Sequence, residues 1–259
     1  MAIVLKKPGE IELMRQASRI VAVVLQAMED VVAPGVSTAK LDEIAEGIIR
    51  QHQAIPSFKG YPHRGENDFP ASVCASINQE IVHGIPRADR VLREGDIISI
   101  DVGTIYKGYQ GDGAITLPVG RVSEEAQRLI DATRAALMVG IGAAWPGKRT
   151  GDISRAIEQY VLGRGYQVVR EYTGHGIGRE MHEDPQVPNY FVAGMLDQKL
   201  RPGMTLALEP MVNVGTWRTR ALADGWTVET EDGKLSAHFE HTIAITDGEP
   251  DVLTRLDGV

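Results

Sequence analysis

The sequence lacks the features of a secreted protein, of a membrane protein and of a nucleic-acid-binding protein. Its single cysteine, Cys74, permits no intrachain disulfide, which fits a reducing compartment. The net charge is −8 and no run of Lys and Arg occurs, which argues against a nucleic-acid substrate. The most apolar helical stretch, 20–25, is far shorter than the roughly 20 residues of a membrane span. The N-terminal charges follow the first apolar run, unlike those of a signal peptide. We therefore expect a cytoplasmic protein without a membrane partner.

One phrase occurs twice in the chain. The first copy, LREGDIISID, ends at Asp101, and the second, LRPGMTLALE, ends at Glu209, 108 residues later. Each copy predicts a glycine turn followed by a buried strand that ends in an acid. A Pro-Gly turn with a downstream threonine also recurs, at 34–38 and at 146–150, with an offset of 112. Chance explains either match alone, but two matches in the same order favour two related halves.

The elements predicted between these motifs are those of an α+β protein. Apolar spacing predicts helices over 10–32, 37–53 and 123–143, and a fourth from Thr150, as its N-cap, to 163. Strands are predicted over 72–76, 97–102 and 114–119, with a hairpin connection over 103–111. We expect one catalytic domain, 1–259, in two pseudo-symmetric halves, about 8–120 and 121–250, with curved sheets inside and helices outside.

Five potential metal ligands stand beside apolar runs or among glycines: Asp101, Asp112, His175, Glu209 and Glu240. A single acid of this kind is more often a cap or an ion-pair member. Four carboxylates in one site would repel one another, because an unpaired buried carboxylate is very costly. Two divalent cations would neutralise them, and oxygen ligands with one imidazole suit Mn, Fe, Co or Zn. Such a site activates water for hydrolysis.

Two other kinds of site are not supported. The zinc-protease motif His-Glu-x-x-His is absent, since His182-Glu183 lacks the second histidine. The run Gly174-His-Gly-Ile-Gly178 has neither the spacing nor the lysine of a phosphate loop. We expect its glycines to let the backbone turn, so that His175 points inward.

Taken together, the motifs resemble those of the type I methionine aminopeptidases, in metallopeptidase family M24. The resemblance spans about 8–247 and rests on HGIP at 83–86, IDVG around Asp101 with Asp112 after it, GHGIG around His175 with His182, EPM from Glu209, and FEHT around Glu240. It implies the pita-bread fold, with curved antiparallel sheets. It also implies removal of the N-terminal methionine from nascent polypeptides that have a small second residue.

The same resemblance implies a role for each ligand. Asp101 would hold one metal through both oxygens, Asp112 and Glu240 would bridge two metals, and His175 and Glu209 would complete the second. The expected cofactors are two divalent ions, Co, Mn, Fe or Zn.

The resemblance also implies residues that act on the substrate. Glu209 would move a proton from the activated water, and His83 and His182 would contact the scissile amide and its developing oxyanion. A pocket for the methionine side chain would be lined by Tyr61, Phe69, Cys74, Met181 and Trp226, for which core packing is an equal alternative. Met181 stands where phenylalanine is common, and the 61–74 segment is about five residues longer than in many bacterial relatives.

Two alternatives stay open. One is another aminopeptidase of the same fold, such as a proline-specific one. The other is a binding protein, such as a ribosome-associated factor, which has no need of the metal ligands. The expected partners are the N-terminal methionine of nascent polypeptides and a transient ribosome contact, and we expect a monomer.

Overall fold

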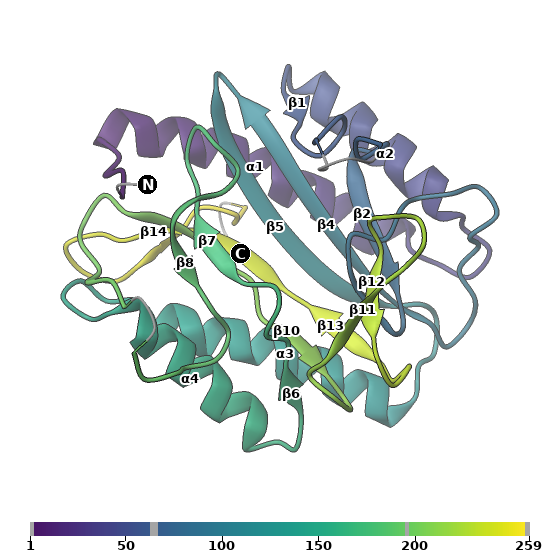
Figure 1. Ribbon diagram of the computed structural model, residues 1–259. Coiled ribbons are helices and arrows are strands. Elements are labelled where there is room, and N and C mark those ends of the chain that lie inside the picture. The colour runs from purple at the N-terminus through teal and green to yellow at the C-terminus, as the bar shows by residue number, and fades with distance from the viewer. Residues whose placement is uncertain (1–2, 63–66, 195–196, 257–259) are drawn as a thin grey trace.

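The structure, a computed structural model, describes residues 3–62, 67–194 and 197–256 (Figure 1). Its helices are α1 (Pro8–Val31), α2 (Thr38–Gln51), α3 (Glu124–Gly142) and α4 (Thr150–Leu162). Its first strands are β1 (Ile55–Pro56), β2 (Val73–Ile77), β3 (Glu80–Val82), β4 (Ile97–Tyr106) and β5 (Tyr109–Pro118). Those of the second half are β6 (Gln167–Val168), β7 (Gly174–Gly176), β8 (Glu183–Val187), β9 (Thr205–Leu208), β10 (Met211–Asn213), β11 (Thr219–Ala221), β12 (Val228–Thr230), β13 (Ser236–His238), β14 (Glu240–Ala244) and β15 (Asp251–Val252).

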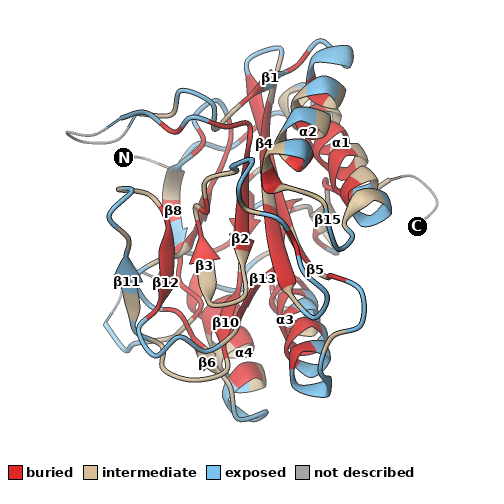
Figure 2. Cartoon of the chain, turned by 90° about the vertical axis from the view of Figure 1, so that its right-hand side faces the viewer, coloured by how far each residue is buried: buried red, intermediate tan, exposed pale blue. Residues whose placement is uncertain are grey.

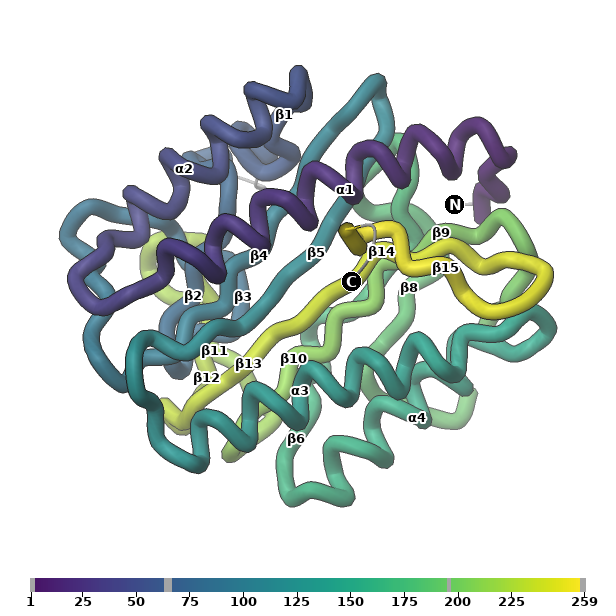
Figure 3. Tube along the Cα trace, turned by 180° about the vertical axis from the view of Figure 1, so that it is seen from behind, coloured from purple at the N-terminus to yellow at the C-terminus, as the bar shows by residue number. Residues whose placement is uncertain are grey.

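A large antiparallel sheet forms the centre of the molecule. Its strands follow the order β1-β4-β5-β14-β9-β7-β8, with β2 beside β4 and β15 beside β14. Two three-stranded sheets, β13-β10-β6 and β11-β12-β3, extend it. The four helices lie on one side of the strands (Figure 3). The strands are largely buried, and the helices expose only their outer faces (Figure 2). No helix among the described residues is both long and apolar enough to cross a bilayer.

Helix starts follow local sequence signals. Pro8 opens α1, where its missing N–H costs nothing, and the Ser37 hydroxyl caps α2 by accepting the N–H of Lys40. The prediction that Thr150 caps α4 is wrong. The N-cap is Arg149, and Asp152 accepts its N–H instead (2.9 Å). Thr150 is the first helical residue, and its hydroxyl accepts a bond from the neighbouring loop.

The hairpin connection predicted over 103–111 is present but shorter than predicted, because both strands continue into this segment. The strands pair up to Tyr106 opposite Tyr109, so the turn is only Lys107-Gly108, both with positive φ (49° and 79°). That is the geometry of a two-residue hairpin turn. The glycine at 111 serves packing instead, since a Cβ there would lie 2.5 Å from the backbone of α1.

The two copies of the repeated phrase adopt the same conformation. Gly95 and Gly203 have φ of +93° and +89°. The N–H of Gly95 donates to the carbonyl of Val119 (3.0 Å), and that of Gly203 to the carbonyl of Ile245 (2.9 Å). Each half also has its own apolar core, built by α1 and α2 in the first and by α3 and α4 in the second. The predicted pseudo-symmetry of the fold is therefore present.

These matching bonds align the last strands of the two halves with an offset of 126, from Val119 to Ile245. By that offset Ala114 corresponds to Glu240, and these two residues are direct partners where β5 pairs with β14. A residue opposite its own counterpart marks a local twofold axis. The pseudo-twofold axis thus passes between β5 and β14, in the middle of the central sheet.

Candidate functional site

The five predicted ligands occupy five neighbouring strands. Asp101 lies on β4, Asp112 on β5, Glu240 at the start of β14, Glu209 directly after β9, and His175 on β7. In the sheet order these strands are adjacent, β4-β5-β14-β9-β7. Segments up to 139 residues apart in sequence, from 101 to 240, therefore meet at one place, which includes the pseudo-twofold axis.

Strand register puts these side chains on one face of the sheet. Asp101 and Glu240 are both opposite Ala114, so all three side chains point the same way. Asp112 is two residues from Ala114 and shares that face. His175 lies opposite Ala207, two residues before Glu209 on the same face. Small neighbours such as Ala114 leave room above the sheet for the longer ligating side chains.

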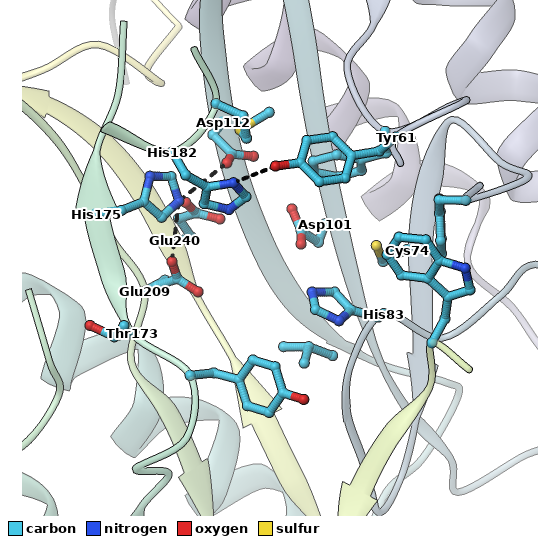
Figure 4. Close-up of a pocket in the computed structure, with 16 residues that line it drawn as sticks. Tyr61, Cys74, His83, Asp101, Asp112, Thr173, His175, His182, Glu209 and Glu240 are labelled. Carbon is cyan, nitrogen blue, oxygen red and sulfur yellow. Dashed lines mark hydrogen bonds and ion pairs between the residues drawn. The ribbon is translucent and has the colours of Figure 1, made fainter. Parts of the chain in front are cut away.

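The side chains converge in one buried cluster (Figure 4). One ligand atom from each of Asp112, His175 and Glu240 lies within 4.8 Å of the others. Nε2 of His175 is 3.9 Å from Oδ2 of Asp112 and 3.5 Å from Oε1 of Glu209. Asp101 adjoins the cluster and lines the same cavity.

The burial of several carboxylates in one cluster favours the binding of a cation. Burial raises the pKa of Asp112 to about 7. Burial and the charges of neighbouring acids raise the pKa values of Asp101, Glu209 and Glu240 well above their usual range. One oxygen each of Asp101, Asp112 and Glu240 is buried without a hydrogen-bond partner in the described part of the chain. The described residues that line the cavity include no Lys or Arg. Divalent cations fit this donor set, because they neutralise the acids and occupy the unbonded oxygens.

His175 is prepared to be a ligand. Its Nδ1–H donates to the carbonyl of Gly176 (2.9 Å), which leaves the lone pair of Nε2 facing the acids. Burial, and then the nearby His182, lower its pKa to about 3, so the ring is neutral. The expectation that the glycines turn the chain is wrong for Gly174 and Gly176, which lie within β7, whereas Gly178 lies in a bend after it. A Cβ at Gly174 would lie 2.6 Å from the carbonyl oxygen of Ala207, so close strand packing requires glycine there.

The two other predicted histidines border the cluster. Nδ1 of His182 is 2.8 Å from the hydroxyl of Tyr61, and its ring centroid is 4.4 Å from that of His175. Burial raises the pKa of Tyr61 and lowers the pKa of His182, so a phenol meets a neutral imidazole. The phenol can donate to Nδ1 or accept from it, and when it donates, Nε2 of His182 carries the ring proton. His83 has a φ of +59° and lies edge-on to Tyr172, with ring centroids 5.6 Å apart.

All five residues predicted to hold a methionine side chain line the apolar end of the same cavity: Tyr61, Phe69, Cys74, Met181 and Trp226. The cavity measures about 180 Å³, a size that accepts a benzene-sized group. Part of the longer 61–74 segment, residues 63–66, lies outside the described residues.

Sequence reasoning missed four lining residues: Phe58, Val82, Tyr172 and Thr173. The chain has few aromatic residues, 3 Trp, 7 Tyr and 4 Phe, and five of them line the cavity. The small number of aromatic residues could therefore have pointed to Phe58 and Tyr172. No feature of the sequence marked Val82 or Thr173.

Comparison with known proteins fits this geometry. Residues 12–247 match the profile of "Metallopeptidase family M24". The chain is 53% identical over 255 residues to a methionine aminopeptidase of Clostridium acetobutylicum, which covers 98% of this chain and 100% of that protein. It is 50% identical to methionine aminopeptidase 1 of Bacillus subtilis, over 98% of this chain and 100% of that protein. The chain belongs to metallopeptidase family M24, among its type I methionine aminopeptidases.

Solved structures give the same result. The methionine aminopeptidase of Thermotoga maritima superposes with a TM-score of 0.94 at 44% identity, covering 98% of this chain and 100% of that one. The prolidase of Pyrococcus horikoshii shares only the fold, with a TM-score of 0.77 at 22% identity over 98% of this chain and 64% of that one. The predicted pita-bread α+β fold and the predicted family are therefore confirmed.

Proposed function

We propose that this protein removes the N-terminal methionine from nascent polypeptides whose second residue is small. The observation that carries the proposal is that a polar and an apolar environment meet in one cavity. A cluster of four acids and one imidazole stands at one end, and an apolar recess that contains Met181 and aromatic rings stands at the other. The full-length similarity to methionine aminopeptidases supports the same activity.

We propose that the five clustered side chains hold two divalent cations, Co, Mn, Fe or Zn: Asp101, Asp112, His175, Glu209 and Glu240. Bound cations supply Lewis acidity and a nucleophile at neutral pH. The protein's part is to fix the ligands rigidly. It does so by placing each on or directly after a different strand of one sheet and by orienting His175 through its bond to the carbonyl of Gly176.

Proton transfer is assigned to Glu209. It lines the cavity beside the other acids, with Oε1 3.5 Å from Nε2 of His175, so this carboxylate is placed to accept a proton and return it. His182 is the proposed donor to the developing oxyanion, with the Tyr61 hydroxyl donating to Nδ1 and the ring proton on Nε2. His83, on the opposite side of the cavity, is proposed to contact the scissile amide.

The apolar recess is proposed to bind the methionine side chain. Edge-on contact between Phe69 and Trp226, with centroids 5.1 Å apart, makes one wall, and Met181 makes another. Sulfur beside aromatic rings is a favourable contact, which suits a thioether substrate. The Cys74 thiol stays protonated, because burial raises its pKa, so the recess presents no additional charge.

The cellular setting is also a proposal. We place the protein in the cytoplasm as a monomer of one catalytic domain, with halves at 8–120 and 121–250. It would contact the ribosome transiently and bind neither nucleic acid as a substrate nor a membrane. The net charge of −8 supports the last two points.

One assay separates this proposal from its alternatives. The metal-loaded protein is incubated with Met-Gly-Met, Ala-Pro and Leu-Gly, with and without a chelator. We expect methionine release from Met-Gly-Met alone, and only without chelator. Cleavage restricted to Ala-Pro would indicate a proline-specific enzyme. No cleavage of any peptide would indicate a binding protein.

A further inference from the structure

His238 is a buried histidine to which no role has yet been given. It ends β13, and only 2% of its side chain is exposed. It does not line the cavity but lies behind Glu209, with Nε2 3.8 Å from Oε2 of that carboxylate. Nε2 has no hydrogen-bond partner within the described residues. A buried polar nitrogen without a hydrogen-bond partner is destabilising, so the presence of a histidine at this position requires an explanation other than stability.

The pseudo-symmetry of the fold relates His238 to Asp112. The offset of 126 that aligns the last strands of the two halves converts 112 into 238. Both residues are held in the same unusual way. The Thr242 hydroxyl accepts the N–H of Asp112 (3.1 Å) and donates to its carbonyl (2.8 Å). The hydroxyl of Thr116, the counterpart of Thr242, does the same for His238 (2.8 Å for both bonds). A sixth side chain, that of His238, therefore stands in a ligand-equivalent position next to the cavity.

The neighbours of the two residues also correspond. Asp112 lies next to Asp101 on the site face, and His238 lies next to Glu209, the counterpart of Asp101 in the repeated phrase. The first half thus pairs two acids, and the second half pairs an acid with an imidazole. Glu209 consequently stands between two rings, with Oε1 3.5 Å from His175 and Oε2 3.8 Å from His238.

We propose that His238 is a positioning residue for Glu209. Its Nε2–H donates to Oε2 in the working enzyme, which leaves Oε1 for the cation beside His175. The present separation is longer than a hydrogen bond, and contacts of this kind tighten when the reacting groups are bound. The clamp by Thr116 uses only backbone atoms of His238, so the ring can be replaced without removing the clamp. The inference rests on the proposed metal-dependent function and adds a residue to it.

Two substitutions of the same chemical type provide the test. His238→Gln places an amide nitrogen near the position of Nε2, whereas His238→Asn places it only as far as Nδ1. Both keep a polar side chain of similar size. We expect H238N to bind Co²⁺ about 10- to 100-fold more weakly, as loss of an orienting partner typically does, and H238Q to bind it nearly as the unmodified protein does. The visible absorption of the Co²⁺-loaded protein should change in H238N and not in H238Q.

The neighbouring His241 gives a matched control. It points to the other face of β14, where Nδ1 contacts the hydroxyl of Thr254 (2.7 Å). His241→Asn should leave the Co²⁺ affinity and spectrum unchanged. Equal Co²⁺ affinity and spectra for H238N, H238Q and the unmodified protein would overturn the inference. If the unmodified protein binds Co²⁺ but releases no methionine, the proposed function fails, and the comparison of H238N with H238Q still decides the role of His238.

Discussion

The hydroxyl of Tyr61 lies 2.8 Å from Nδ1 of His182, and it links the first half of the chain to a histidine of the second. The tyrosine belongs to the predicted methionine pocket, but its polar end serves the neighbouring histidine. With the phenol as donor to Nδ1, the ring proton of His182 lies on Nε2, where it can contact an oxyanion. One side chain thus borders both the binding recess and the reacting groups.

Removal of this hydroxyl should affect turnover more than binding. Tyr61→Phe keeps the ring in the recess and loses one hydrogen bond worth about 1 kcal/mol, so kcat should fall about fivefold to tenfold. KM for Met-Gly-Met should hardly change. Steady-state kinetics check this, with Tyr160→Phe on α4 as the control. A rise in KM at constant kcat would instead show that the hydroxyl only binds substrate.

Removal of the cations should abolish activity and lower stability. The buried acids then lose their counter-charge, and the stabilisation that a bound ligand adds is lost, about 2.7 kcal/mol per site at a cation concentration 100-fold above Kd. Thermal unfolding and Met-Gly-Met hydrolysis, with chelator and after return of Co²⁺ or Mn²⁺, measure both effects.

Asp101→Asn should prevent that recovery. The amide offers one weaker oxygen in place of two charged ones, so kcat/KM should stay at least about 100-fold below that of the unmodified protein after the cation is returned. Asp247→Asn, on an exposed turn, is the control. Turnover by D101N at the unmodified rate would show that Asp101 is not a ligand.

Much of this site could be predicted from the sequence, because its candidate ligands stand beside strand-like runs that repeat. Asp101 and Glu209 end the two copies of one repeated phrase, and their strands, β4 and β9, belong to one sheet. Period-two alternation does not depend on the tertiary fold, so residues that share a face can be recognised locally.

The other features of the fold and the site could not be predicted, because they depend on contacts between segments that are far apart in the sequence. The sequence predicts a turn at Gly111 because glycine is frequent in turns, whereas in the structure this glycine allows the backbone of α1 to pack against β5. His238 precedes the Phe-Glu240 motif and has no sequence feature that distinguishes it from a core histidine. Its relation to Asp112 appears only when the strand register and the threonine clamps are known.

The buried acid cluster should lower the stability of the metal-free protein near neutral pH. Burial raises the pKa of Asp112 from 3.8 to about 7, so between those pH values the folded metal-free protein keeps a proton that the unfolded chain has released. Its stability therefore falls as the pH rises through this window. In Asp112→Asn the dependence should be weaker, and near pH 7 the metal-free variant should be more stable than the unmodified protein, although inactive. Urea midpoints near pH 5 and pH 7 measure this, with the exposed Asp131→Asn as the control. Parallel pH dependence in D112N and the unmodified protein would contradict the assignment.

Two glycine substitutions should have opposite effects on stability. Gly47 is exposed in the middle of α2, and a Cβ there would have no neighbour within 4 Å. Gly47→Ala should therefore stabilise the protein by about 0.5–1 kcal/mol, because alanine loses less backbone entropy in a helix.

A Cβ on Gly111 would lie 2.5 Å from the backbone nitrogen of Ser18, so α1 must move away from β5. Gly111→Ala should cost about 1–3 kcal/mol. It should also lower kcat, because the neighbouring Asp112 shifts with the strand, whereas Gly47→Ala should leave kcat unchanged. Urea unfolding and Met-Gly-Met hydrolysis on the two variants measure both effects, and a stable, fully active G111A would show that α1 does not constrain the ligand strand.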